Sequence, residues 1–543
     1  MTDYEKLAYK IFKDIEPISY LEEKYKKRNT LGLVTRFAPS PTGFVHTGSL
    51  FAALISYRMA KQTNGVFYFR LEDTDTKREV DNSKYQLLDE LKSFGIIPDE
   101  GYLGDKEEGL YGPYTQSNRK FIYDIVINEL IKRNLAYPCF CNNDELNKCR
   151  CEQESLKVRT GYYGKWAKCR DLSPLEAIKK IDNNEPYIIR FKSHGNFNNK
   201  IKVHDLIRGD LELSQNDLDI VIRKSDFLPT YHFAHLCDDH FMRTTTVIRG
   251  EEWLPSLPIH LELFDALGFE RPSYAHLPVI MKLDNGKRRK LSKRHDPEAS
   301  VSYFLEKGYP IEAILEYLFT IANSNYEEWR MNNKSYDDFI MTFDKMSLDG
   351  ALFDMNKINS ISKELLGSMT KEEIAKRSYE WALEYDNNLK EFIESDYDYY
   401  VKIMGLEREK ENPRKDYEKY SDILTAIQYF NLDNYLELIS TQNIAYDSDI
   451  INSYLSSLDC SNEDEWLDYL KEKANTLGYC INNKEYKANK EKYKGNFGAF
   501  MGVIRLLVTG RSVSQNLYHI GKIIGKENLE KRFEKAIEII SKK

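Results

Sequence analysis

Hydrophobic and polar positions near the start of the chain predict a strand, a helix and a second strand. The stretch 34–39 is mostly apolar and partly β-branched, which is typical of a buried strand, and it is ended by Pro39, Pro41 and Gly43. Apolar residues then recur at helical spacing over 49–64, and Gly65 suits the end of that helix. The apolar run 66–71 is the next strand. This pattern predicts a β-α-β unit.

Two residues, His46 and Gly48, lie where the first strand leads into the helix. Backbone N–H groups in the first turn of a helix have no partner within the helix, and the helix dipole adds positive potential there. Such a position binds phosphate groups. We therefore expect a phosphate group beside His46 and Gly48.

The rest of the chain is mostly helical in pattern. From about Met369 onward almost every segment has the helical period and a high charge, and strand candidates are few. Residues 1–30 predict a short helical extension, and residues 310–318 predict an amphipathic helix that opens with a proline. The chain contains no internal repeat and no low-complexity run.

Composition indicates a large protein of several domains. A length of 543 residues suggests two to four domains, and a hydrophobic content of 41% is enough for several cores. No apolar run has the length of a transmembrane helix, and the N-terminus lacks the pattern of a signal peptide. We therefore expect a cytoplasmic protein without a membrane partner.

The net charge of −8 argues mildly against nucleic-acid binding. A local basic face matters more than the total charge, and the chain has three candidates, which are residues 24–28, 287–290 and 484–494 with their interleaved tyrosines. The alternative for each stretch is a solvated helix or loop surface, which the stretch taken alone favours.

Eight cysteines are spread unevenly, with five between Cys139 and Cys169. In a cytoplasmic protein such clustering favours a metal over disulfides. The cluster contains two Cys-x-Cys pairs, which fit a four-thiolate zinc site. The alternative is a set of reduced thiols in a domain that folds without metal.

Two motifs indicate a family. The stretch Thr35 to Gly43, followed by His46-Thr-Gly48, and the later Lys290-Leu-Ser-Lys293-Arg294 resemble the two nucleotide-binding motifs of class I aminoacyl-tRNA synthetases. The segment 37–43 and the segment 70–75 are similar to glutamyl-tRNA synthetases of the bacterial type. Glutaminyl relatives typically carry a Pro-Glu-Pro segment in the first position. The resemblance runs in recognisable motifs from about residue 34 to 318.

The resemblance implies an α/β fold, with a Rossmann-like catalytic domain, an inserted acceptor-binding domain and an all-α anticodon-binding region. The domains expected are the helical extension 1–30, the first half of the catalytic domain 31–130, the insertion with the cysteine cluster 131–225, the second half of the catalytic domain 226–285, the lysine loop and stem-contact helices 286–368, and the anticodon-binding region 369–543.

The resemblance also implies a reaction, in which ATP activates L-glutamate and the glutamate is then transferred to tRNA(Glu). Chemistry at phosphate of this kind needs positioning and charge neutralisation more than a covalent catalyst. By resemblance, His46 and Gly48 cradle the ATP, and Lys290 and Lys293 hold its phosphates with Mg²⁺ as cofactor. Glu252 and Trp253 match positions near the ATP.

A glutamate pocket needs cations, because an unpaired buried carboxylate is costly. By resemblance, the glutamate-site residues are Arg36, Ser40, Glu72, Tyr231 and Arg249. Arg249 can pair with the side-chain carboxylate through two hydrogen bonds, and Glu72 can meet the ammonium. One position departs from the family, because His235 stands where many members have asparagine. His235 either contacts the substrate or is a core histidine.

Some relatives bind a structural zinc at the matching cysteines. The resemblance assigns Cys139, Cys141 and Cys169 as ligands and leaves the fourth ligand open. Tyr163 lies in a matching element, and Cys151 is the better candidate chemically, since a thiolate binds zinc more tightly than a phenol.

Two other functions compete with glutamate–tRNA ligation. One is an enzyme that glutamylates a modified tRNA base, although such relatives lack the long C-terminal region present here. The other is a non-catalytic tRNA-binding paralogue, although such proteins usually lose the histidine or a lysine of the motifs. A monomer is usual for the family. The sequence leaves open whether tRNA(Gln) is also charged and which residues contact the anticodon.

Overall fold

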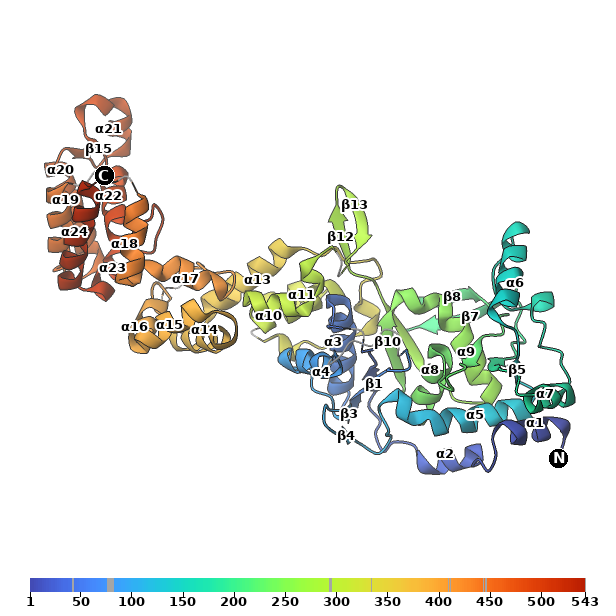
Figure 1. Cartoon of the computed structure of the whole chain (residues 1–543). Coiled ribbons are helices and arrows are strands. Elements are labelled where there is room, and N and C mark those ends of the chain that lie inside the picture. Colours follow the sequence, from blue (N-terminus) through green and yellow to red (C-terminus); the bar gives the residue numbers. More distant parts are fainter. Residues whose placement is uncertain are drawn as a thin grey trace. The chain divides into compact units, whose positions relative to one another are not determined.

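The computed structural model describes residues 1–41, 43–75, 83–292, 295–333, 335–408, 410, 412–442, 444 and 447–542. The chain divides into two compact units (Figure 1). The first contains Met1–Tyr303 and Leu315–Asp354, and the second contains Phe304–Ile314 and Met355–Lys543.

The first sheet confirms the predicted β-α-β unit. Strand β1 (Val34–Phe37) is buried throughout and pairs in parallel with β2 (Val66–Phe69), and helix α3 (Thr47–Gln62) connects them. Strand β3 (Glu100–Tyr102) adds to β2 in parallel, and β4 (Glu107–Glu108) adds to β3 antiparallel. Helix α4 (Ser83–Ser93) lies between β2 and β3 in the chain.

The second sheet has the order β10-β11-β7-β8. Strands β10 (Thr246–Gly250) and β11 (Ser273–Leu277) are parallel, and helix α9 (Leu257–Leu267) connects them. The hairpin of β7 (Lys200–Asp205) and β8 (Gly209–Ser214) extends this sheet, because Asp205 pairs with Tyr274 of β11.

The two sheets meet where β1 lies beside β10. The backbone N–H of Thr245 donates to the carbonyl of Val34 at 3.0 Å, next to the start of both strands. From this point β2 continues the sheet on one side and β11 continues it on the other. In an open α/β sheet, the carboxyl ends of the strands at such a reversal form the ligand crevice.

A small antiparallel sheet, β5-β6-β9, separates the halves of the parallel sheet in the chain. Its strands are β5 (Ala136–Cys139), β6 (Ile188–Phe191) and β9 (Val221–Arg223). Helices α6 (Asn143–Ser155) and α7 (Pro174–Asp182) lie between β5 and β6 in the chain. Helix α5 (Lys120–Lys132) precedes β5, and α8 (Tyr231–Phe241) follows β9.

The N-terminal extension forms two helices, as its pattern predicts. Helix α1 (Asp3–Ile11) packs against both α5 and α7, and α2 (Ile18–Lys24) packs against α5 (Figure 1). A capping box at Thr2 and Glu5 begins α1.

A hairpin of β12 (Met281–Asp284) and β13 (Lys287–Lys290) follows the second parallel sheet. Three helices come next, α10 (Val301–Lys307), α11 (Ile311–Ala322) and α12 (Tyr326–Met331). Among the residues that the structure describes, no helix combines the length and the apolar character needed to cross a bilayer.

The second unit is almost entirely helical and has its own apolar core, which includes Ile423, Tyr435, Phe500 and Leu529. Its one strand pair in the described ranges is β14 (Tyr479–Cys480) with β15 (Gly495–Asn496). The helices are α13 (Met355–Ser368), α14 (Lys371–Tyr385), α15 (Asn387–Ser395), α16 (Tyr397–Met404), α17 (Ser421–Ile427), α18 (Leu432–Thr441), α19 (Ser448–Ser457), α20 (Glu463–Thr476), α21 (Asn483–Ala488), α22 (Phe497–Thr509), α23 (Leu517–Ile524) and α24 (Lys526–Ser541).

Candidate active site

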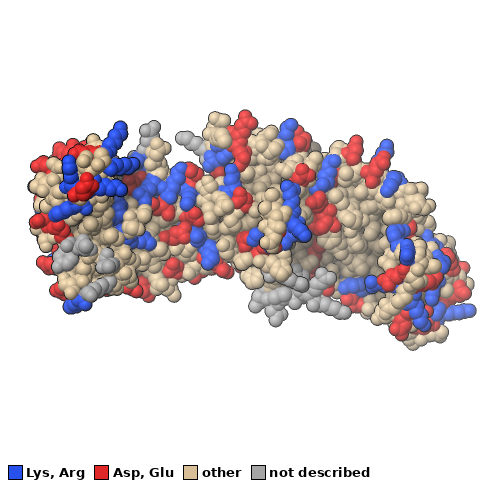
Figure 2. Space-filling model, turned by 90° about the horizontal axis from the view of Figure 1, so that it is seen from above, with Lys and Arg blue, Asp and Glu red and all other residues tan. Residues whose placement is uncertain are grey.

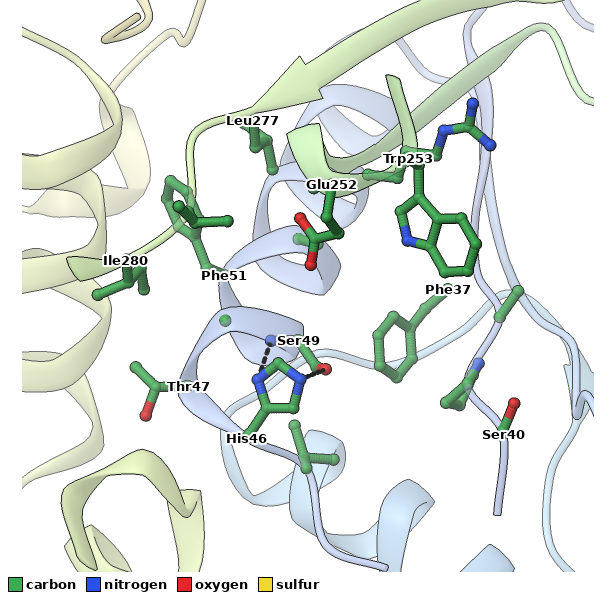
Figure 3. Close-up of a pocket in the computed structure, with 18 of the residues that line it drawn as sticks. Phe37, Ser40, His46, Thr47, Ser49, Phe51, Glu252, Trp253, Leu277 and Ile280 are labelled. Atoms are coloured by element: carbon green, nitrogen blue, oxygen red, sulfur yellow. Dashed lines mark hydrogen bonds between the residues drawn. The ribbon is translucent and has the colours of Figure 1, made fainter. Parts of the chain in front are cut away.

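A cavity of about 510 Å³ opens at the carboxyl ends of β1 and β10. Its apolar wall includes Phe37, Phe51, Leu277 and Ile280 (Figure 3). The cavity brings together most of the residues that the sequence singles out, which are Arg36, Ser40, His46, Gly48, Glu72, Tyr231, Arg249, Glu252, Trp253 and Lys290.

His46 is held at the N-terminus of α3, as the N-cap residue. Its Nδ1 accepts a hydrogen bond from the backbone N–H of Ser49 at 3.1 Å, and its Nε2 lies 2.9 Å from the Ser49 hydroxyl (Figure 3). The imidazole therefore bonds to Ser49 through both ring nitrogens. The contact with Ser49 was not predicted from the sequence, although a serine three residues after a histidine N-cap could have indicated it.

Gly48 allows this arrangement. A Cβ at this position would lie 3.1 Å from Cε1 and 3.2 Å from Nδ1 of His46, which is closer than an ordinary van der Waals contact. A side chain here would push the imidazole away from the first turn of α3. The glycine thus lets the ring and the backbone N–H groups face one cavity.

The lysine hairpin reaches the same cavity. Lys290 ends β13, and its Nζ lies 3.1 Å from Oε1 of Glu252. Figure 3 shows Glu252 and Trp253 on the side of the cavity opposite His46. The other motif lysine, Lys293, lies outside the described residues, together with Arg294.

The carboxylate of Asp296 anchors the β12-β13 hairpin. Asp296 is buried and accepts hydrogen bonds from Nη1 and Nη2 of Arg289 at 2.6 and 2.7 Å, and from the backbone N–H of Ser292 at 3.0 Å. Sequence reasoning missed this pair, because nothing in the local pattern distinguishes Arg289 from its basic neighbours.

Two acidic residues and two arginines form a buried network at the end of β1 and β2. Arg36 lies 3.3 and 3.4 Å from the carboxylate oxygens of Asp239, and Arg70 donates to Asp239 at 2.7 Å and to Glu72 at 3.0 Å. Burial raises the pKa of Glu72, while the nearby Arg70 and Arg36 oppose that shift. Arg36 is therefore already paired with an internal carboxylate.

Arg249 has no such carboxylate. Its Nε donates to Nε2 of His276 at 3.0 Å, and its Nη1 lies 3.3 Å from Nδ1 of His260. Its buried Nη2 has no hydrogen-bond partner among the described residues, and none of their carboxylates forms an ion pair with it. The cavity therefore contains a guanidinium with a donor left to satisfy.

Tyr231 and Trp253 pack against each other, with ring centroids 4.4 Å apart and planes tilted by 30°. His235 lies one helical turn beyond Tyr231 but is fully buried and does not line the cavity. Its Nδ1 lies 3.0 Å from Asp239, its Nε2 lies 3.1 Å from the Tyr274 hydroxyl, and burial lowers its pKa to about 3. The structure thus places His235 in the core rather than on the cavity surface.

Three of the predicted zinc ligands come together. The sulfur atoms of Cys139, Cys141 and Cys169 lie within 4.8 Å of one another, and those of Cys141 and Cys169 are 3.6 Å apart. The hydroxyl of Tyr162 lies 3.4 Å from the Cys139 sulfur and 3.3 Å from the Cys141 sulfur. A hydrogen bond from Cys169 and one from Tyr162 lower the pKa of the Cys139 thiol to about 5, against the effect of burial.

The two candidates for a fourth ligand are elsewhere. Cys151 is exposed on α6, outside the cluster. The Tyr163 hydroxyl donates to the carbonyl of Arg159 at 2.8 Å, and its ring packs on Trp166. The tyrosine at the cysteines is Tyr162, so the expectation was displaced by one residue. Two adjacent tyrosines are equivalent in sequence, and only packing shows which one points inward.

Comparison with known proteins finds two family matches along the chain. Residues 32–360 match the family described as tRNA synthetases class I (E and Q), catalytic domain, and residues 414–537 match the family described as anticodon binding domain.

The relatives agree over nearly the full length. The chain is 44% identical to the glutamate–tRNA ligase of Clostridium beijerinckii, over 99% of this chain and 100% of that one. It is 43% identical to the glutamate–tRNA ligase of Acetivibrio thermocellus, over 98% and 100%. Among solved structures, the glutamate tRNA ligase of Elizabethkingia meningosepticum in complex with its amino acid superposes with a TM-score of 0.75 at 28% identity, covering 93% of this chain and 99% of that one.

Proposed function

This chain belongs to the glutamate–tRNA ligases of the class I synthetase family, and we propose how its cavity carries out the reaction. ATP and L-glutamate bind side by side at the carboxyl ends of β1 and β10. An oxygen of the α-carboxylate of glutamate attacks the α-phosphorus of ATP. The bond from that phosphorus to the oxygen bridging the α- and β-phosphates breaks, and diphosphate leaves. The 3′-terminal ribose hydroxyl of tRNA(Glu) then loses its proton as its oxygen attacks the carbonyl carbon of the glutamyl-adenylate, the bond from that carbon to the phosphate oxygen breaks, and AMP leaves.

The nucleotide occupies the end of the cavity formed by His46, Gly48 and Lys290. The first turn of α3 supplies N–H groups and the positive end of the helix dipole, which suit phosphate. Lys290 exchanges its partner Glu252 for a phosphate oxygen when ATP enters, and Lys293 is proposed to act beside it. Mg²⁺ accompanies the phosphates, which are its usual ligands in such sites. Trp253 is proposed to contact the nucleoside.

Glutamate occupies the other end, between Arg249 and Glu72. The unpartnered Nη2 of Arg249 carries this assignment, because a buried cation without a carboxylate partner fits the side-chain carboxylate of the substrate. The carboxylate of Glu72 accepts a hydrogen bond from the ammonium group of the glutamate substrate. Arg36, Ser40 and Tyr231 complete the pocket. His235 supports it from the core, through Asp239.

The cysteine cluster is proposed to hold one structural zinc ion. Tetrahedral zinc with Zn–S bonds of about 2.3 Å separates its sulfur ligands by about 3.8 Å and a sulfur from an oxygen ligand by about 3.5 Å. The distance of 3.6 Å between Cys141 and Cys169 and the distances of 3.3 and 3.4 Å to Tyr162 fit that geometry. We therefore assign Tyr162, in place of Cys151, as the fourth ligand.

A single copy of the chain suffices for this chemistry, because every residue proposed to act on glutamate or ATP comes from one chain. We therefore propose that the enzyme is a monomer, which light scattering of the purified protein tests. Its relatives are translation enzymes, and we propose that it works in the cytoplasm.

Aminoacylation with purified components tests the function. The full chain, ATP and labelled glutamate should charge tRNA(Glu), whereas labelled glutamine should not be accepted. The same tRNA without its terminal adenosine is the control and should stay uncharged. Charging of the shortened tRNA would indicate attachment to a base, and tRNA binding without charging would indicate a non-catalytic paralogue. Substituting tRNA(Gln) shows whether that tRNA is also a substrate.

A further inference from the structure

The guanidinium of Arg249 is held from behind by two histidines. Arg249, on β10, donates from Nε to Nε2 of His276, on the neighbouring strand β11, at 3.0 Å. Its Nη1 lies 3.3 Å from Nδ1 of His260, on α9. All three side chains are buried. Arginine has donors only, so both of these histidine nitrogens must be unprotonated acceptors.

This requirement determines the tautomer of His276. With Nε2 accepting, the proton of the neutral ring lies on Nδ1, which is 2.6 Å from Oδ2 of Asp205. Asp205 is completely buried at the end of β7, the strand beside β11. Its other oxygen, Oδ1, accepts from the backbone N–H groups of Ile207 and Arg208 at 3.0 and 2.9 Å. Those bonds direct Oδ2 at the imidazole.

The second histidine follows the same logic. His260 accepts at Nδ1, so its Nε2 carries the proton and donates to Nδ1 of His232 at 3.0 Å. Burial lowers the pKa of His260, His232 and His276, which keeps all three rings neutral.

Neutral acceptors have a consequence that a carboxylate partner would not have. They orient a guanidinium without cancelling its charge, whereas a buried carboxylate beside it would pair with it and compete with any anionic ligand. Arg36, paired with Asp239, shows the second arrangement in the same cavity. In the Arg249 arrangement, the carboxylate of Asp205 acts on the guanidinium only through the imidazole of His276.

We infer that Asp205 and His276 are positioning residues that set the specificity for glutamate. Asp205 holds His276 in the tautomer that accepts from Arg249, and His276 keeps the free edge of Arg249 aimed at the side-chain carboxylate of glutamate with its full charge. This inference rests on the proposed role of Arg249.

The test is Asp205→Asn in the full chain. The amide oxygen can keep the bonds to the backbone N–H groups, so the amide NH₂ takes the place of Oδ2 and donates to Nδ1 of His276. The ring then carries its proton on Nε2, where a donor faces the donor of Arg249. In a Ser-His-Asp triad, the same Asp→Asn change keeps the geometry but gives the histidine the wrong tautomer, and catalysis falls strongly. We expect KM for glutamate to rise about 10- to 100-fold, the loss expected for one hydrogen bond to a charged group, while KM for ATP stays unchanged.

The same hairpin offers a matched control. Asp210 lies 2.7 Å from Nδ1 of His204 on its exposed face, so Asp210→Asn makes the same chemical change away from the cavity. It should leave both KM values unchanged.

A second pair of variants keeps the inference testable if Asp205→Asn does not fold. His276→Gln retains an acceptor near the position of Nε2 and should keep much of the wild-type affinity for glutamate. His276→Leu removes the acceptor and should lose that affinity. An unchanged KM for glutamate in Asp205→Asn and His276→Leu, or an equal rise in KM for glutamate and for ATP, would overturn the inference. Arg249→Ala separates the two claims, because an unchanged KM for glutamate in that variant refutes the role of Arg249 itself.

Discussion

At the scale of single residues, the environment of a side chain decides its role more than its type does. Arg36 and Arg249 each lie one residue before the end of a strand, at the same cavity. Arg36 has Asp239 as an internal partner, whereas Arg249 is hydrogen-bonded to two neutral histidines. Arg249 is therefore better suited than Arg36 to bind the carboxylate of a substrate, and substituting Arg249 should change amino-acid specificity more.

Arg249→Ala should therefore remove most glutamate activation, through both KM and kcat, and narrow the preference over glutamine. Glutamine presents amide donors to a residue that has donors only, so the wild-type discrimination should be on the order of 10³ or more in kcat/KM. Arg249→Lys should rescue only in part, because lysine keeps the charge without the two-pronged geometry. The measurement is aminoacylation with each amino acid in turn. Full selectivity in Arg249→Ala would make Arg36 the leading candidate for the side-chain carboxylate.

Lys290→Ala should slow activation by about 10²–10³-fold, the usual effect of removing one donor from a developing charge. Lys287 begins the same strand and does not line the cavity, so Lys287→Ala is the matched control. Single-turnover kinetics with saturating substrates separates the two variants. Wild-type rates in Lys290→Ala would exclude this lysine from the mechanism. The same loss is expected for Lys293→Ala.

At the scale of elements, the N-terminal helices connect parts of the first unit that are distant in sequence. Helix α1 packs on α5 and α7, and Arg28, just after α2, pairs with Glu100 of β3 and donates to the carbonyl of Met242 at 3.0 Å. Its guanidinium also lies 3.8 Å from the ring centroid of Tyr111. The extension is thus a structural part of the catalytic unit.

Arg28→Ala should lower the free energy of unfolding by about 3 kcal/mol, because it leaves the largely buried side chain of Glu100 without its partner. Lys27→Ala, at an exposed position next to it, should have almost no effect. Urea denaturation monitored by fluorescence measures both. Equal stability of the two variants would show that the extension contributes little to the unit.

The cysteine cluster makes a second prediction at this scale. Protein purified without chelator should contain about one zinc per chain, and Cys139→Ser should lower both the zinc content and the thermal stability before it changes glutamate affinity. Cys151→Ser should keep the zinc, since Cys151 lies outside the cluster. Elemental analysis with thermal denaturation distinguishes them, and a metal-free, fully active wild type would rule the site out.

At the scale of the whole molecule, we expect both units to take part in tRNA recognition. The first contains the cavity, and the match to an anticodon binding domain, residues 414–537, lies in the second. Basic and acidic side chains are interspersed over the face shown in Figure 2, in keeping with the net charge of −8. Affinity for tRNA should therefore come from local basic segments. The stretch 484–494 is one, and its lysines are exposed.

Lys487→Ala combined with Lys490→Ala should weaken tRNA binding and reduce its dependence on salt, because fewer phosphates are neutralised. Glutamate affinity should not change. The control is Lys376→Ala with Lys402→Ala, a pair of exposed lysines on other helices of the second unit. Binding titrations at several salt concentrations give both values. An equal loss in the two double variants would mean a diffuse charge effect instead of a local tRNA contact.

The sequence by itself determined those features that depend on short stretches of neighbouring residues. The period of apolar residues predicted β1, α3 and β2, and the residues at their junction placed His46 and Gly48 at a helix N-terminus. Motif resemblance identified the family and selected Arg36, Glu72 and Arg249 for the cavity. Such features depend on residues that are neighbours in the chain, so they can be predicted before the fold is known.

Only the tertiary structure decided which side chains face the cavity and what stands behind them. His235 and Tyr231 lie on one face of α8, yet one is core and the other is cavity wall. Tyr162 and Tyr163 are adjacent, yet only Tyr162 meets the cysteines. Asp205, His276 and Arg249 come from three strands, β7, β11 and β10. Contacts between residues so far apart in sequence arise from sheet register and packing, which no local pattern encodes.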